Sequence, residues 1–140
     1  MHDKLNIKGE WFLEWRNIDG ILLGSQMLNN FITTAGKNLI AQEIENLSSP
    51  YLVLGTDTTA GEVITEGFRK AVSIITRTSN LVRFRTQMLA SEANGNWEKA
   101  SLFYGASSTV GTGTMFNLLV SPFSKTSNQI LTIEIKITVS

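Results

Sequence analysis

Very few side chains in this 140-residue sequence could carry out chemistry. The only histidine is His2, near the N-terminal end, and there is no cysteine. A Ser–His–Asp triad, a cysteine nucleophile and a multi-histidine metal centre all need residues that the chain lacks. Disulfides and thiolate metal sites are excluded for the same reason. We therefore expect a protein that is not an enzyme and that holds no cofactor and no metal.

Carboxylate pairs are the remaining route to acid–base catalysis. Four glutamates lie near expected turns or strand ends, at positions Glu62, Glu66, Glu92 and Glu98. Acid–base work needs two carboxyl groups at a defined separation and with unequal pKa values. Spacing along the chain does not define such a pair, so we expect glutamates that are solvated or paired with arginine.

Glu66 and Arg69 are the strongest candidates for a structural ion pair. They begin an apolar segment, and an arginine can hold a carboxylate through two parallel hydrogen bonds. Such a pair would pin the preceding long loop to the sheet. The alternative is an exposed pair, which would contribute only ~0–1 kcal/mol to stability. Neither interpretation is catalytic.

Two loops could hold an ion or a phosphate group. Asp57 lies among Thr56, Thr58 and Thr59, but a dedicated calcium site gathers several carboxylates and this loop has one. Residues 111–114 (GTGT) lack both the third glycine of a dinucleotide loop and the lysine of a P-loop. We therefore expect both segments to be ordinary surface loops or turns.

Charge and hydropathy restrict the partners. The 12 basic and 12 acidic residues cancel, whereas nucleic-acid binders usually carry a basic surplus; Arg83 and Arg85 form a local basic pair. Residues 1–8 contain no apolar run of the secretion-signal type, and no apolar stretch approaches the ~18 residues that span a bilayer. We expect a soluble protein made in the cytoplasm, with no nucleic-acid or membrane partner.

The N-terminal thirty residues predict a β-hairpin. Residues 7–16 alternate Trp11, Leu13 and Trp15 with Glu10, Phe12 and Glu14, and residues 21–28 would form the partner strand. Asp19-Gly20 favours the tight turn between them, because glycine accepts a positive φ. The tryptophans either fill the protein's own core or belong to an arm that lies on a neighbouring subunit.

One helix and several strands follow. Thr33 or Thr34 can cap a helix that carries Leu39, Ile40, Ile44 and Leu47 on one face and stops at Ser48-Ser49-Pro50. Expected strands cover residues 51–54, 68–78, 81–89, 97–104, 115–120 and 131–139, with Pro122 ending the fifth. The last strand alternates five aliphatic residues with polar ones, which indicates one buried face.

This pattern predicts a mainly β fold, a β-sandwich or barrel-like domain with one short helix and an N-terminal hairpin or arm. Residues 1–30 form the hairpin or arm and residues 31–140 the β-sandwich domain, in one compact domain overall. No internal repeat and no linker divides the chain.

Several segments, in this order, carry a resemblance that spans most of the chain. They are residues 30–36 (NFITTAG), 54–59 (LGTDTT), 66–70 (EGFRK), 92–95 (EANG), 102–103 (LF), 113–116 (GTMF) and 121–126 (SPFSKT). Together they resemble a family of small virion proteins of tailed phages, described as head-decoration or tail-fibre-associated proteins. Ser101 stands where the family often has glycine before its Leu-Phe pair. The first thirty residues match least well, which suits a variable arm.

The resemblance implies a β-rich, non-enzymatic protein of the virion that assembles symmetrically as a homo-oligomer, with a trimer as the expected form. Its expected function is capsid decoration, or cementing, by binding the lattice of the major capsid protein. A tail, tail-fibre or baseplate component is the alternative, and a carbohydrate-binding module with Trp97 and Tyr104 exposed is a further one. Large aromatic residues dominate interfaces, so Trp11, Phe12, Trp15 and Trp97 are the predicted contact residues.

Overall fold

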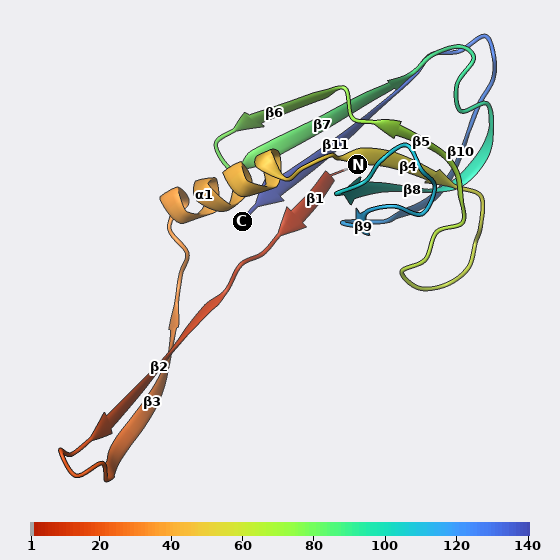
Figure 1. Ribbon diagram of the computed structural model, residues 1–140. Helices are drawn as coiled ribbons and strands as arrows, with labels where there is room; N and C mark the ends of the chain where they lie inside the picture. The colour runs from red at the N-terminus through yellow and green to blue at the C-terminus, as the bar shows by residue number, and fades with distance from the viewer. Residues whose placement is uncertain (1) are drawn as a thin grey trace.

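The structure, a computed structural model, describes residues 2–140 and consists of three β-sheets and one helix. The first sheet has the order β1-β11-β7-β6, and the second has the order β10-β8-β4-β5 with β9 beside β8. A third sheet contains β2 and β3 alone, and it projects from the other two (Figure 1). The strands of the first sheet are β1 (His2–Leu5), β11 (Leu131–Val139), β7 (Leu81–Met88) and β6 (Ile74–Thr78). Those of the second are β10 (Leu119–Lys125), β8 (Gly95–Tyr104), β4 (Tyr51–Gly55), β5 (Glu66–Ala71) and β9 (Thr114–Met115).

The two larger sheets share one hydrophobic core and do not close into a barrel. Leu52, Leu54 and Leu102 enter this core from the second sheet, and Phe84 and Ile137 enter it from the first. This arrangement confirms the prediction of a mainly β fold with one helix. We call the two sheets and the helix together the sandwich.

Strand β11 follows the strict alternation of its sequence. It pairs antiparallel with β7 over its length, from Leu131 opposite Met88 to Thr138 opposite Leu81. Ile135, Ile137 and Val139 are fully buried, and together they contribute about 5–9 kcal/mol of gross hydrophobic stabilisation. Leu131 and Ile133 are only half-buried, because they lie at the open side of the sandwich.

Helix α1 (Thr34–Asn46) starts where the sequence predicts, and it packs against β6, β7 and β11. The hydroxyl of Thr33 caps it by accepting a hydrogen bond from the N–H of Gly36 at 3.1 Å. Its buried residues are Ala41 and Ile44. The predicted face is therefore wrong in part, because Leu39 and Leu47 are exposed and the small Ala41 is fully buried.

Two predicted strands are wrong in their limits. The expected strand 68–78 is divided into β5 and β6, which belong to different sheets. The chain crosses at Val72-Ser73, where Val72 donates to the carbonyl of Pro50 and Ser73 to that of Arg85. The expected strand 115–120 is also divided, into β9 and β10. Pro122 lies inside β10 rather than ending a strand, since β10 is an edge strand with a bulge and can tolerate a residue without an N–H.

The N-terminal segment is shared between the sandwich and the projecting hairpin. Strand β1 pairs in parallel with the end of β11, from His2 opposite Lys136 to Leu5 opposite Val139. The chain then leaves the sandwich, forms β2 (Gly9–Arg16) and β3 (Leu22–Asn30), and returns into α1 (Figure 1). We call residues 9–30 the arm.

Candidate functional site

The arm is a regular antiparallel hairpin with a well-defined turn. Its register runs from Gly9 opposite Asn30 to Trp15 opposite Gly24. At the turn, the side-chain oxygen of Asn17 accepts hydrogen bonds from the N–H groups of Asp19 and Ile21, both at 3.0 Å. Gly20 has a φ of +84°, which explains why glycine stands there. The sequence prediction of a hairpin around Asp19-Gly20 is confirmed.

The arm carries most of the exposed apolar surface of the molecule. Among the described residues, ten of the eighteen exposed large hydrophobic side chains lie between residues 11 and 31. Trp11 is 64% exposed, Phe12 62% and Trp15 49%, so the core interpretation of the two tryptophans is wrong. The physical reason is the position of the hairpin, which extends beyond the sandwich and has no layer packed on either face (Figure 1).

The two faces of the arm differ in character. Partners in register share a face, so Trp11, Leu13 and Trp15 lie on the same side as Leu28 and Gln26. We call this the tryptophan face. The opposite face carries Phe12 and Met27 together with the charged side chains of Glu10, Glu14 and Arg16, of which Glu14 and Arg16 form an ion pair. The tryptophan face is therefore the less polar of the two.

The arm and the residue after it expose several aromatic rings. The rings of residues 11, 12 and 15 on the two faces of the arm, with Phe31 beside it, together expose on the order of 500 Å². Large exposed apolar patches often mark interaction sites. A two-stranded hairpin is also only marginally stable in water by itself. The arm thus has the character of an element that another surface covers.

Trp97 and Tyr104 do not lie at the surface. Trp97 is 6% exposed, and its indole N–H donates to the carbonyl of Ala93 at 2.8 Å while the ring packs near Phe68. Tyr104 is also buried, and its hydroxyl donates to the carbonyl of Ile44. Burial raises the pKa of Tyr104. The prediction of Trp97 as a contact residue is therefore wrong, as is the exposed Trp97–Tyr104 face that a carbohydrate-binding module requires.

Glu66 and Arg69 form a buried pair with two parallel hydrogen bonds of 2.8 Å. The pair fixes the loop 105–113 rather than the loop before β5. Arg69 donates to the carbonyls of Ser107 and Thr112 and to the hydroxyl of Thr112, and Glu66 accepts from the N–H of Gly111. The hydrogen bonds from Arg69 lower the pKa of Glu66. The buried structural interpretation is correct, and the exposed-pair alternative is wrong.

Asp57 forms part of a second buried network. Lys99, which is fully buried, donates to the carboxylate of Asp57 at 2.9 Å and to the carbonyls of Thr59 and Val63 at 2.7 Å. Hydrogen bonds from the N–H of Thr65 and from Lys99 hold the pKa of Asp57 well below its usual range. The loop 56–65 is therefore held over the outer face of β8 by the ammonium group of Lys99.

Lys125 is a third buried anchor, which sequence reasoning missed. Its ammonium group donates to the carbonyl of Ala90 and to the side chain of Asn94, at 3.2 and 2.7 Å. Next to it, Glu92 accepts a hydrogen bond from Lys70 at 2.7 Å, and this bond lowers the pKa of Glu92. The three networks use charge to fix loops.

No catalytic arrangement emerges within residues 2–140. His2 makes a hydrogen bond of 2.8 Å with the hydroxyl of Thr138, and no hydrogen bond from its ring to a carboxylate is found among the described residues. No group of three or more potential metal-ligating side chains occurs in that range. Nor does that range contain a helix with the length and apolar character to cross a membrane.

Comparison of the chain with models of protein families, with curated proteins and with solved structures gives no match.

Proposed function

We propose that the protein is a non-enzymatic structural protein of a tailed-phage virion, and that it acts as a decoration protein bound to the lattice of the major capsid protein. The observation that carries the proposal is the arm, a projecting hairpin with ten exposed large apolar side chains at and beside it. Nothing in the sandwich covers this surface. A protein built in this way requires a partner.

The sandwich supports this function because buried ion pairs and hydrogen bonds fix its loops. Its loops are anchored by the Glu66–Arg69 pair, the Asp57–Lys99 pair and the Lys125 contacts described above. A decoration protein must hold its shape while an arm engages a neighbour, and buried anchors of this kind hinder loop opening. The resemblance of seven segments to phage virion proteins supports a place in the virion, and the arm supplies the contacts through which copies of the protein assemble.

Symmetric assembly repeats one contact many times. The four aromatic rings and six other apolar side chains exposed at and beside the arm lie on both of its faces, so each arm offers apolar contacts to a neighbouring copy. We propose a homo-oligomer, in the first instance a trimer, in which the arms provide the contacts.

A tail or tail-fibre component is the second candidate within the same class. It would use the arm in the same way but at a few sites in the particle. We do not propose a carbohydrate-binding module, because the Trp97 and Tyr104 side chains that would contact a sugar are buried.

The test is the number of copies per virion, measured by quantitative mass spectrometry on purified phage particles against the major capsid protein. A number comparable to the capsid protein supports decoration of the shell. A small number, typical of a tail ring or fibre, assigns the protein to the tail. Absence from purified particles overturns the proposal.

A binding experiment tests the role of the arm. Particles that lack the protein are incubated with the purified wild type or with Trp11→Ala/Trp15→Ala, and bound protein is measured after sedimentation. We expect the double variant to lose most of its binding, because it lacks the two rings of the tryptophan face. It should still fold, because these rings face solvent and contribute little to folding. The matched control is Val110→Ala, which removes a 69% exposed side chain from the loop 105–113 and should bind as the wild type does.

A further inference from the structure

A second apolar surface lies at the other end of the molecule. It is a cavity of about 240 Å³ between the edges of the two sheets, lined mainly by Leu119 and Phe123 of β10 and by Leu131, Ile133 and Ile135 of β11. We call it the β10–β11 groove. Engineered apolar cavities of ~150 Å³ take up a benzene ring, so the groove has room for one large aromatic side chain.

The groove borders an unpaired strand edge. Strand β1 covers only the end of β11, beginning with His2 opposite Lys136. Over residues 131–133, no described strand lies beside β11 on that side. An open edge of this kind can add a strand from another chain. The edge of β10 across the groove is less suited to pairing, because it contains Pro122 and a bulge.

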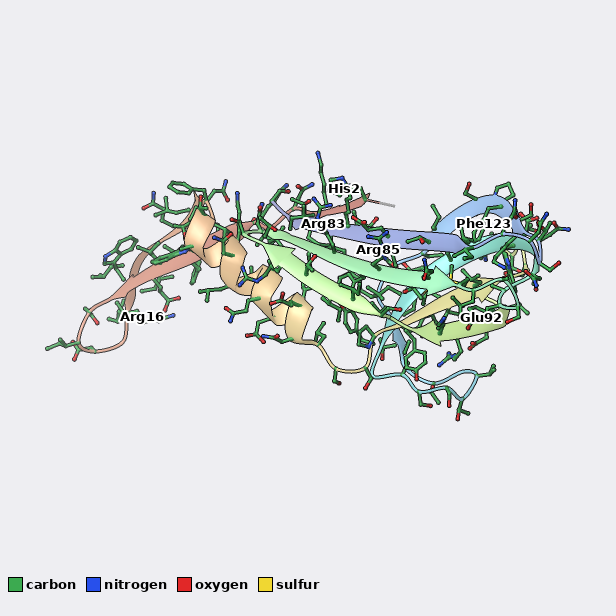
Figure 2. The ribbon with its side chains drawn as sticks, turned by 90° about the horizontal axis from the view of Figure 1, so that it is seen from above. His2, Arg16, Arg83, Arg85, Glu92 and Phe123 are labelled. Atoms are coloured by element: carbon green, nitrogen blue, oxygen red, sulfur yellow. The ribbon has the colours of Figure 1, made fainter. Side chains whose placement is uncertain are left out.

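The arm and the groove lie at opposite ends of the chain. Figure 2 shows Arg16 near the tip of the arm at one end of the molecule and Phe123, which lines the groove, at the other. An eight-residue strand is about 27 Å long, and the arm points away from the groove, so it does not fold back onto its own groove. A neighbouring copy in a head-to-tail arrangement brings one arm to one groove.

We propose that the tryptophan face of the arm binds the β10–β11 groove of a second copy of this chain, with one edge of the arm added to the open edge of β11. This inference rests on the assembly role given to the arm under the proposed function, and it names the receiving site. A single contact between identical chains covers both unpaired apolar surfaces of each copy at once. A different protein on the arm would leave every groove and every β11 edge uncovered.

The geometry of the contact has a consequence for symmetry. A head-to-tail contact joins two different surfaces and is therefore heterologous; it gives a ring if the rotation closes and a filament if it does not. A closed ring of three copies would leave no arm and no groove free. The same holds for any closed ring, and the proposed trimer is the smallest ring with more than two copies.

Cysteine cross-linking tests the contact directly, because the wild-type chain has no cysteine. When the tryptophan face enters the groove, the opposite face of the arm continues the outer face of β11. Ser25→Cys places a thiol on that opposite face of the arm, and Thr132→Cys places one on the outer face of β11 beside its open edge; both side chains are exposed. The two purified variants are mixed under mild oxidation. A disulfide requires Cα atoms about 4.4–6.8 Å apart. We expect a mixed disulfide, because adding the arm to the open edge of β11 brings the two cysteines close together. In the control, Ser108→Cys in the exposed loop 105–113 replaces Thr132→Cys and should give at least tenfold less mixed product.

Light scattering of the purified protein gives an independent measurement. We expect a concentration-dependent oligomer for the wild type, a monomer for Trp11→Ala/Trp15→Ala, and an oligomer for the opposite-face control Phe12→Ala/Met27→Ala. Circular dichroism verifies that both variants fold. The inference is overturned by a wild type that stays monomeric up to its solubility limit, or by a tryptophan variant that still assembles. Cross-linking to Thr132→Cys no greater than to Ser108→Cys also overturns it.

These results are separable from the test of the proposed function. Protein that is abundant in virions but does not cross-link arm to groove keeps the virion role, with the arm on another virion protein. Protein that cross-links but is absent from particles keeps the arm–groove contact and removes the virion role.

Discussion

Replacing Arg69 by alanine should destabilise the protein much more than the loss of a surface ion pair does. The side chains of Arg69 and Glu66 are only 4% and 8% exposed. Arg69→Ala leaves the Glu66 carboxylate buried, with the N–H of Gly111 as its remaining hydrogen-bond donor. Removing one member of a buried pair costs about 3–5 kcal/mol. We expect the upper part of that range, since three hydrogen bonds from Arg69 to the loop 105–113 are lost as well.

The measurement is the free energy of unfolding in urea, followed by circular dichroism. A loss of ~3–5 kcal/mol is a large fraction of the ~5–15 kcal/mol that typically holds a domain together, and it should lower the Tm by roughly 10–15 °C. The control is Arg83→Ala, because Arg83 pairs with Glu134 at 3.1 Å but both side chains are partly exposed. Its cost should stay within ~1 kcal/mol.

A second variant identifies the cause of the loss. Glu66→Gln/Arg69→Ala replaces the buried charge by a neutral amide, so it should recover part of the stability that Arg69→Ala loses. The reasoning is refuted if Arg69→Ala costs no more than Arg83→Ala, or if the double variant is less stable than Arg69→Ala.

Three further outcomes follow from the structure. Ile135→Asp places a charge in the fully buried row of β11 and should abolish cooperative unfolding, whereas Thr132→Asp on the exposed face of the same strand should not; thermal melts compare them. The pKa of Asp57 is lower in the folded protein than its value near 3.8 in the unfolded chain. Its pairing with Lys99 therefore stabilises the fold fully at a pH above 3.8, and this stabilisation is lost as the pH falls toward the pKa of the folded state. Asp57→Asn should therefore be less stable at neutral pH and should lose less stability than the wild type on acidification, and parallel slopes would contradict this. Limited trypsin treatment of the isolated protein should cut first in the arm, after Arg16, because the arm lacks a packed layer; first cleavage within the sandwich would count against this description.

Sequence patterns predicted the elements whose signals are local. The alternation of residues 131–139 fixes one buried face of β11, and Asp19-Gly20 with Asn17 before it specifies the turn of the arm. Both depend on residues that are neighbours in the chain. The capping hydroxyl of Thr33 is predictable for the same reason.

The features that sequence reasoning missed depend on contacts between distant segments. Both faces of β8 are covered, by the core on one side and by the loops 56–65 and 105–113 on the other, so Trp97 and Lys99 are buried in a strand without clear alternation. A lysine in a strand usually indicates a solvent-exposed position. Only the position of Asp57 beside Lys99 in the folded protein reveals that this lysine is a buried anchor. The opposite error affected Trp11 and Trp15. Their alternation indicates a face that needs cover, but not which chain provides it.

Hydrogen exchange of the arm amides tests the central claim most directly. The backbone of residues 9–30 is compared in the dilute isolated protein and in the assembled particle, with the amides of β11 residues 135–139 as an internal reference. We expect fast exchange of the arm in the isolated protein, because a two-stranded hairpin without a packed layer opens readily, and strong protection after assembly. Equal exchange of the arm in both states would contradict the claim that the arm is the element through which the protein assembles.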